Sequence, residues 1–164
     1  MTATWLAVAG IVILALIGAT YAVWRATRRP EKVDNFDRSR REFHLQREHL
    51  EAKFFELAAS SGKPRGLEWT SCEFDDEVSY ARNRESGDLA ALVGVTISFA
   101  AIVGGDMEDV EAVGNLRAAT AVFVYVDQHW RTEGRAIFNL SPTEAIRHFH
   151  SSLEMVAHDP ATRV

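Results

Sequence analysis

Two histidines separated by a single residue, His148 and His150, are the most conspicuous candidates for metal binding in this sequence. They stand in a stretch of helical periodicity, where residues two positions apart point about 200° from each other around the axis. A zinc site requires three or four converging ligands. Each histidine lies four residues from a glutamate, Glu144 or Glu154, so the spacing predicts two separate surface pairs and no metal site.

A short acidic loop is the second group of residues that could bind a ligand. Four carboxylates follow two glycines: Asp106, Glu108, Asp109 and Glu111. Their order lacks the glycine after the third ligand and the closing glutamate of an EF-hand calcium loop, which favours a solvated loop over a calcium site. Because glycines flank the segment and binding residues concentrate on loops, we expect this loop to contact a protein partner.

A third set of polar and aromatic residues could line a pocket on a concave sheet face: Tyr125, Trp130, Arg135 and Asn139. The alternative for Trp130 is a place in the core.

Cys72 is the only cysteine, so no intrachain disulfide is possible, and a small core residue is favoured over a nucleophile. Nucleophile-elbow, phosphate-loop, dinucleotide and Cys-x-x-Cys motifs are absent. The sequence predicts no cofactor and favours a non-enzymatic protein, with enzymatic activity left open.

The first element that positions these residues is an uncharged segment over residues 2–24, bracketed by Trp5 and Trp24. A helix of about 20 apolar residues spans the hydrocarbon core of a bilayer, and aromatic residues prefer its edges. A cleaved signal peptide would need a basic start, which the sequence lacks. We therefore expect a transmembrane helix within residues 1–33, with a basic flank formed by Arg25, Arg28, Arg29 and Lys32.

The distribution of charge predicts how the chain is oriented. Residues 25–65 carry a net charge of +4 and residues 66–164 one of −9, within a total of −5. Cationic flanks stay in the cytoplasm, so we expect the N-terminus outside and the following domain inside, as in a single-pass protein of a bacterial cell membrane. The acidic domain argues against nucleic-acid binding. Small residues spaced by four in the uncharged segment leave a homodimer open.

Residues 34–61 are predicted to form a juxtamembrane amphipathic helix. Apolar residues recur every seven positions, and Gly62, Pro64 and Gly66 end the pattern in a linker over residues 62–66. A coiled coil would also need apolar residues at Arg40 and Arg47. We therefore favour packing of this helix on the domain's own sheet over a dimeric stalk.

Residues 67–158 are predicted to form an α+β domain, followed by a tail over residues 159–164. Alternating β-branched and aromatic residues indicate four to five antiparallel strands. Two short strands are expected on either side of Asp75, Asp76 and Glu77. Ser141, Pro142 and Glu144 form a capping box that begins a C-terminal helix, whose apolar spacing continues to Ala157 and which should pack on the sheet. This element order resembles the architecture of cystatin-like and NTF2-like domains.

Two functions are consistent with these features of the sequence. The first is a membrane-anchored, non-enzymatic binding or scaffold module that acts on a protein partner at the bilayer. The alternative is a tethered domain that binds a small ligand or acts as an enzyme, with a pocket between the closing helix and the sheet. Polar groups converging in a concave apolar cavity would favour the alternative.

Overall fold

The computed structural model describes residues 34–61, 66–108, 110 and 116–161. The chain divides into two units, residues 1–41 and 42–164, and the tertiary contacts given below are those of the second unit. Within the described ranges, no helix is both long enough and apolar enough to cross a membrane. Outside those ranges lie the predicted transmembrane helix and its interfacial residues, Trp5, Trp24, Arg25, Arg28 and Arg29.

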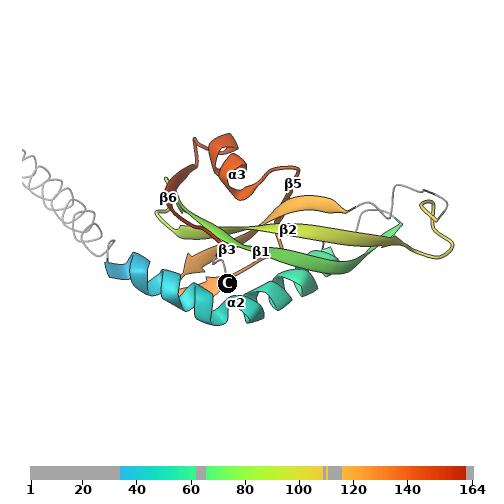
Figure 1. Ribbon diagram of the computed structural model, residues 1–164, viewed down its shortest axis with the longest axis horizontal. Coiled ribbons are helices and arrows are strands. Elements are labelled where there is room, and N and C mark those ends of the chain that lie inside the picture. The colour runs from blue at the N-terminus through green and yellow to red at the C-terminus, as the bar shows by residue number, and fades with distance from the viewer. Residues whose placement is uncertain (1–33, 62–65, 109, 111–115, 162–164) are drawn as a thin grey trace, which may run out of the picture. The chain divides into compact units, whose positions relative to one another are not determined.

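An antiparallel sheet of six strands forms the centre of the domain (Figure 1). The strand order is β4-β3-β2-β1-β6, and β5 pairs with β3 beside Ala119–Ala121. The α+β class and the antiparallel pairing predicted from sequence are confirmed, although the sheet has six strands instead of four or five. The strands are β1 Leu67–Asn83, β2 Leu89–Ala101, β3 Arg117–Val126, β4 His129–Arg131, β5 Ala136–Phe138 and β6 Leu153–Asp159.

Helix α2, Asp34–Ser61, packs on one face of the sheet through a stripe of residues that begins at Phe43. Phe43 and Phe54 are fully buried, and their rings lie 5.5 Å and 6.0 Å from that of Phe123 on β3. Burying a phenylalanine stabilises a fold by roughly 2–3 kcal/mol. Leu50 and Ala58 are buried in the same stripe. The helix therefore packs on its own sheet, the packing favoured over a coiled coil.

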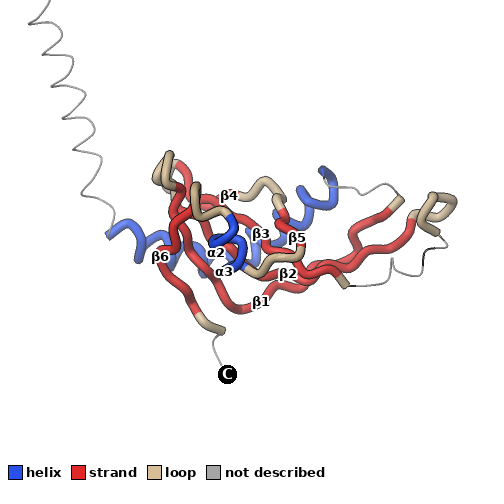
Figure 2. The backbone as a smooth tube through the Cα atoms, turned by 90° about the horizontal axis from the view of Figure 1, so that it is seen from above, coloured by secondary structure: helices blue, strands red, loops and turns tan. Residues whose placement is uncertain are grey.

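Helix α3, Pro142–His148, lies on the opposite face from α2 (Figure 1). Its predicted capping box is present: Ser141 Oγ accepts a hydrogen bond from the backbone N–H of Glu144, and Glu144 Oε2 accepts one from the N–H of Ser141. Ala145 and Ile146 are buried on this side, in a small core with residues of β1 and β2. Strands β1 and β2 extend well past α3 (Figure 2).

The prediction that the C-terminal helix continues to Ala157 is wrong. Helix α3 ends at His148, and after a turn the chain forms β6, which pairs antiparallel with β1 over Val78–Asn83. Two serines, Ser151 and Ser152, interrupt the helical pattern, and serine favours turns and caps over helix interiors. The apolar residues beyond them fit either a helix or a strand. They form the strand because the backbone N–H and C=O groups at the open edge of β1 need hydrogen-bond partners.

Two strand boundaries also differ from expectation. The segment Asp75–Glu77, predicted as a connection between two strands, is an irregularity within the single long strand β1, where the pairing with β2 shifts between Phe74 and Val78. The residues after the tight turn at Asp127 and Gln128 form two short strands, β4 and β5, which is one reason why the sheet has more strands than the four or five expected. Gly134 lies in the break with a φ of 70°.

Candidate functional site

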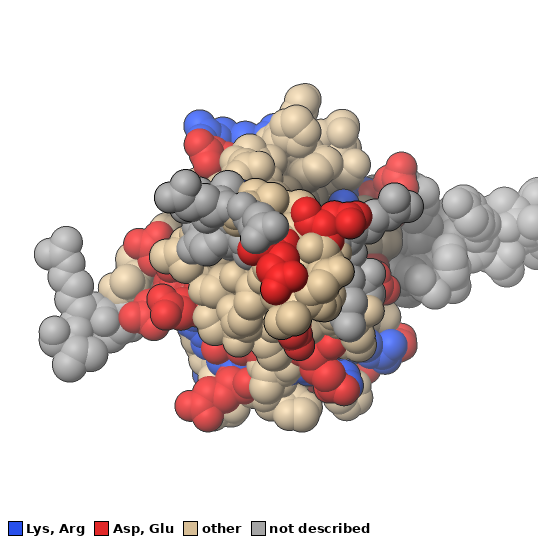
Figure 3. Space-filling view, turned by 90° about the vertical axis from the view of Figure 1, so that its right-hand side faces the viewer, with Lys and Arg blue, Asp and Glu red and all other residues tan. Residues whose placement is uncertain are grey.

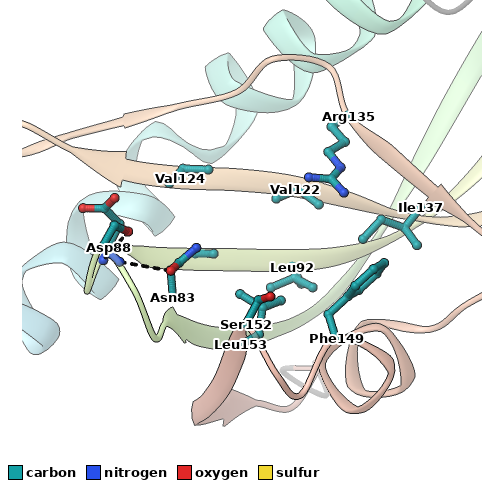
Figure 4. A pocket seen from close by; sticks show the side chains of 12 residues that line it. Asn83, Asp88, Leu92, Val122, Val124, Arg135, Ile137, Phe149, Ser152 and Leu153 are labelled. Atoms are coloured by element: carbon teal, nitrogen blue, oxygen red, sulfur yellow. Dashed lines mark hydrogen bonds between the residues drawn. The ribbon is translucent and has the colours of Figure 1, made fainter.

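A pocket of about 350 Å³ lies on the α3 side of the sheet (Figure 4). Its floor is formed by side chains of β2 and β3 that point to this face, including Leu92 and Val122, and Phe149 and Leu153 form a wall beside α3 and β6. The hollow exists because α3 has only seven residues and covers part of the face. The volume lies near the lower end of the range for small-molecule sites, about 300–1,000 Å³.

The guanidinium group of Arg135 lies over the apolar floor, near Val122 and Ile137 (Figure 4). Arg135 follows Gly134 in the link between β4 and β5, and its backbone carbonyl accepts a hydrogen bond of 3.2 Å from Val122. Within the part of the chain that the structure describes, its side chain makes no hydrogen bond or ion pair. A guanidinium over an apolar surface is a donor for the carboxylate or phosphate of a bound molecule.

The opposite end of the pocket is the turn between β1 and β2. Asn83 Oδ1 accepts hydrogen bonds from the backbone N–H groups of Glu85 and Ser86, at 2.9 Å and 3.1 Å. The hydroxyl of Ser86 accepts one from the N–H of Asp88, at 3.3 Å. These bonds fix the turn, and Asp88 contributes a carboxylate to the rim. The pocket is therefore an apolar hollow with a cation at one end and polar groups at the other.

Of the four residues predicted to share a pocket, only Arg135 lines this one. Trp130 is 5% exposed on the α2 side, where its ring lies 4.9 Å from Phe43 and 5.1 Å from Tyr125. The hydroxyl of Tyr125 donates to Glu42 Oε2 at 3.1 Å. Asn139 is exposed in a turn with a φ of 61°. Tyr125 and Trp130 are a cross-strand pair and so must share one face.

The pocket residues that the sequence did not reveal come from segments distant in the chain. The sequence pattern indicates a polar turn for Asn83 and Asp88, and a continuous helix for Phe149 and Leu153. The spacing of Leu92, Val122 and Val124 could have placed them on one face, since the pairing of Leu92 with Val122 follows from the register of β2 and β3. The turn after α3 has no comparable signal.

The acidic loop lies at the far end of the sheet. Asp106 and Glu108 are exposed, and Glu108 Oε2 accepts a hydrogen bond of 2.8 Å from the N–H of Gly104. Figure 3 looks onto this end, where Asp and Glu side chains are spread over the face and Lys and Arg lie mainly near its margins. Val103 is 87% exposed beside the loop. Asp109 and Glu111 lie outside the described residues.

The histidines at positions 148 and 150 have separate surroundings. The ring of His148 packs edge-on against Phe149 at 4.8 Å, and His150 Nδ1 lies 3.1 Å from the carbonyl of Arg147. Among the described residues, no group of three or more His, Cys, Asp or Glu side chains is arranged to hold a metal ion. Burial raises the pKa of the half-buried Cys72 thiol to about 11, so the thiol is protonated at neutral pH.

Comparison of the chain with protein-family models, with curated proteins and with solved structures finds no match. The pocket and the surfaces described above are therefore the observations from which a function is inferred.

Proposed function

We propose that the protein is a membrane-tethered, non-enzymatic binding module that holds a small molecule with an apolar body and one acidic group. The observation that carries this proposal is the placement of Arg135 over the apolar floor of the α3-side pocket. An anionic group would accept hydrogen bonds from the guanidinium while the body of the ligand covers Leu92, Val122 and Phe149. Charge-assisted hydrogen bonds of this kind contribute about 1.5–3 kcal/mol each.

Tethering to a bilayer is supported by the sequence alone. Residues 2–24 are uncharged and long enough to cross the hydrocarbon core as a helix, and the cations that follow them favour a cytoplasmic domain. Fusion of reporters active only inside or only outside the cell to Val164 tests this orientation. Activity of the outer reporter alone would overturn the proposed cytoplasmic placement.

The binding test uses the full chain in nanodiscs of zwitterionic lipid, because detergent would itself fill an apolar pocket. Phenylbutyrate is titrated by calorimetry, with phenylbutanol as the neutral ligand of matched size. We expect binding of the acid, and a loss of roughly tenfold or more in affinity for Arg135→Gln. Arg131→Gln is the control, because Arg131 is exposed, pairs with Asp127 at 3.2 Å and does not line the pocket.

Three results would count against the pocket as the binding site. They are equal affinity for the acid and the alcohol, equal losses in the two arginine variants, and the absence of saturable binding for a series of aryl and alkyl carboxylates.

A second candidate function is a scaffold that binds a protein partner through the acidic loop. The observation that favours it is the proximity of exposed apolar residues to the loop: Val103 is 87% exposed and Leu116 is 63% exposed. Exposed apolar surface with a rim of polar residues is a mark of protein interaction sites. Crosslinking from a photoreactive residue at Val103 in the bacterial host would test it, and crosslinks only to lipid or to no protein would contradict it.

A further inference from the structure

A second surface of the molecule lies along the edge of β1, away from the α3-side pocket. Strand β1 has 17 residues, but β6 pairs with it only over Val78–Asn83. In the described part of the chain, no strand lies beside Ser71–Phe74 on the side opposite β2. In a strand, alternate residues direct their backbone N–H and C=O groups to each side, so this stretch presents unpaired groups to solvent.

The sequence explains why β6 does not continue along this edge. Pro160 follows Asp159, the last residue of β6, and proline has no N–H to donate to a ladder. The Oδ2 atom of Asp159 lies 3.1 Å from Nε2 of His44 on α2, which fixes the end of the strand at that point. Pro160 and the contact between Asp159 and His44 therefore end the pairing of β6 with β1, and this leaves the stretch Ser71–Phe74 of β1 open.

A groove of about 450 Å³ runs between this edge and α2. We define the β1 edge groove by Glu48, Glu51, Ala52 and Phe55 of α2 and by Cys72 and Phe74 of β1, all of which line it. Phe55, Cys72 and Phe74 are partly buried and supply an apolar floor. A strand added to the edge of β1 would direct every second side chain onto this floor.

The charge around the β1 edge groove is negative. Residues 67–77 contain five Asp or Glu and no Lys or Arg, and Glu48 is exposed on the helix side. The guanidinium of Arg47 on α2 is already engaged: its Nε donates to Glu51 Oε1 at 2.6 Å, and its other nitrogens donate to the carbonyls of Asp75 and Asp76. Pairing with a second copy of this edge would place like charges side by side, which is unfavourable.

We propose that the edge of β1 binds an extended basic segment of a partner protein as an added strand. Its apolar side chains would lie on Phe55, Cys72 and Phe74, and its alternate Lys or Arg residues would face Glu73 and the solvent side of the sheet. The irregularities in β1 at Thr70 and at Asp75–Glu77 limit the regular pairing to Ser71–Phe74. In strand addition, main-chain hydrogen bonds supply affinity and the alternate side chains supply specificity.

The experiment measures binding of a short synthetic peptide of alternating Lys and Val to the full chain in nanodiscs of zwitterionic lipid, by fluorescence anisotropy. A peptide of the same composition with its lysines and valines in separate blocks tests the alternation. N-methylation of every second backbone nitrogen, in each of the two registers, tests the ladder. We expect one register to lower affinity roughly tenfold or more and the other to leave it nearly unchanged.

Variants of the protein test the location. Ala52→Trp fills the groove from an exposed helix position, and Glu73→Lys reverses the exposed charge that would face the basic residues of the added strand; both should weaken binding roughly tenfold. Glu85→Lys is the matched control, because Glu85 is exposed in the turn between β1 and β2, outside the open stretch Ser71–Phe74 and the groove.

Equal affinity for the alternating and block peptides, equal effects of the two N-methylation registers, or equal losses in Glu73→Lys and Glu85→Lys would overturn the proposal in favour of general electrostatic attraction. The absence of binding to the full chain, as when another segment of the same chain occupies the edge, would also overturn it. None of these results bears on the binding of acids near Arg135.

Discussion

The Nε2 atom of His44 on α2 lies 3.1 Å from Oδ2 of Asp159, the last residue of β6, and joins two segments separated by 115 positions. Only 10% of the Asp159 side chain is exposed, against 45% of that of His44. The pair therefore fixes the end of an edge strand to the helix that covers the sheet.

Replacing His44 by alanine should destabilise the domain, because a mostly buried carboxylate loses a hydrogen-bond donor. We expect a decrease of about 1 kcal/mol in the free energy of unfolding, measured by urea titration. His49→Ala is the control, since His49 is exposed on the same helix. A decrease of the same size in both variants would show that the effect comes from the helix and not from the contact with Asp159.

The two glycines Gly134 and Gly104 allow a matched test of close packing against α2. Both have a positive φ, 70° and 77°. A Cβ on Gly134 would lie 2.5 Å from the backbone nitrogen of Ala58 and 2.8 Å from the carbonyl carbon of Leu57, whereas one on Gly104 would meet nothing within 4 Å.

Gly134→Ala should therefore cost clearly more stability than Gly104→Ala. The backbone strain of alanine at positive φ, about 1 kcal/mol, is common to both variants, and only the first adds a clash with helix backbone. Thermal unfolding of the two proteins measures the difference. Equal losses would mean that the link between β4 and β5 moves away from α2 without cost.

The thiol of Cys72 should react slowly with iodoacetamide at neutral pH, because burial raises its pKa to about 11 from the ordinary value of 9.0. The rate should increase up to about pH 11, while the urea-unfolded chain should reach its maximum near the ordinary value. The folded state holds the thiol proton of Cys72 more tightly than the unfolded chain does. The contribution of this proton to the free energy of unfolding is therefore present below pH 9 and is lost between about pH 9 and pH 11. A fast reaction of the folded protein at neutral pH would contradict this environment.

Features of the fold set by local chemistry could be predicted from the sequence. The capping box at Ser141, the apolar stripe containing Phe43 and Leu50, and the alternation in β2 each depend on neighbours within a few positions. The direction of the chain after Phe149 could not, because its residues fit a helix or a strand and the unpaired edge of β1 selects the strand. The same limit applies to the site. The sequence pattern groups Arg135 with Trp130 in one pocket because it does not reveal the break between β4 and β5 at Gly134.

The α3-side pocket provides the last prediction, since Val122 is central to its floor and is only partly buried. In Val122→Phe the larger ring would occupy the hollow near Arg135 and Phe149 (Figure 4). We expect the folded state to persist and binding of phenylbutyrate to be lost, measured by calorimetry with the full chain in nanodiscs.

A change on the opposite face of the sheet serves as the control for this variant. Ala52→Trp fills the β1 edge groove and should leave acid binding unchanged, while Val122→Phe should leave binding of the alternating peptide unchanged. The two sites share no lining residue and lie on opposite faces of the sheet, so each substitution should affect one ligand. Retention of acid binding in Val122→Phe would show that the acid binds elsewhere, and loss of both ligands in either variant would show that the domain had unfolded.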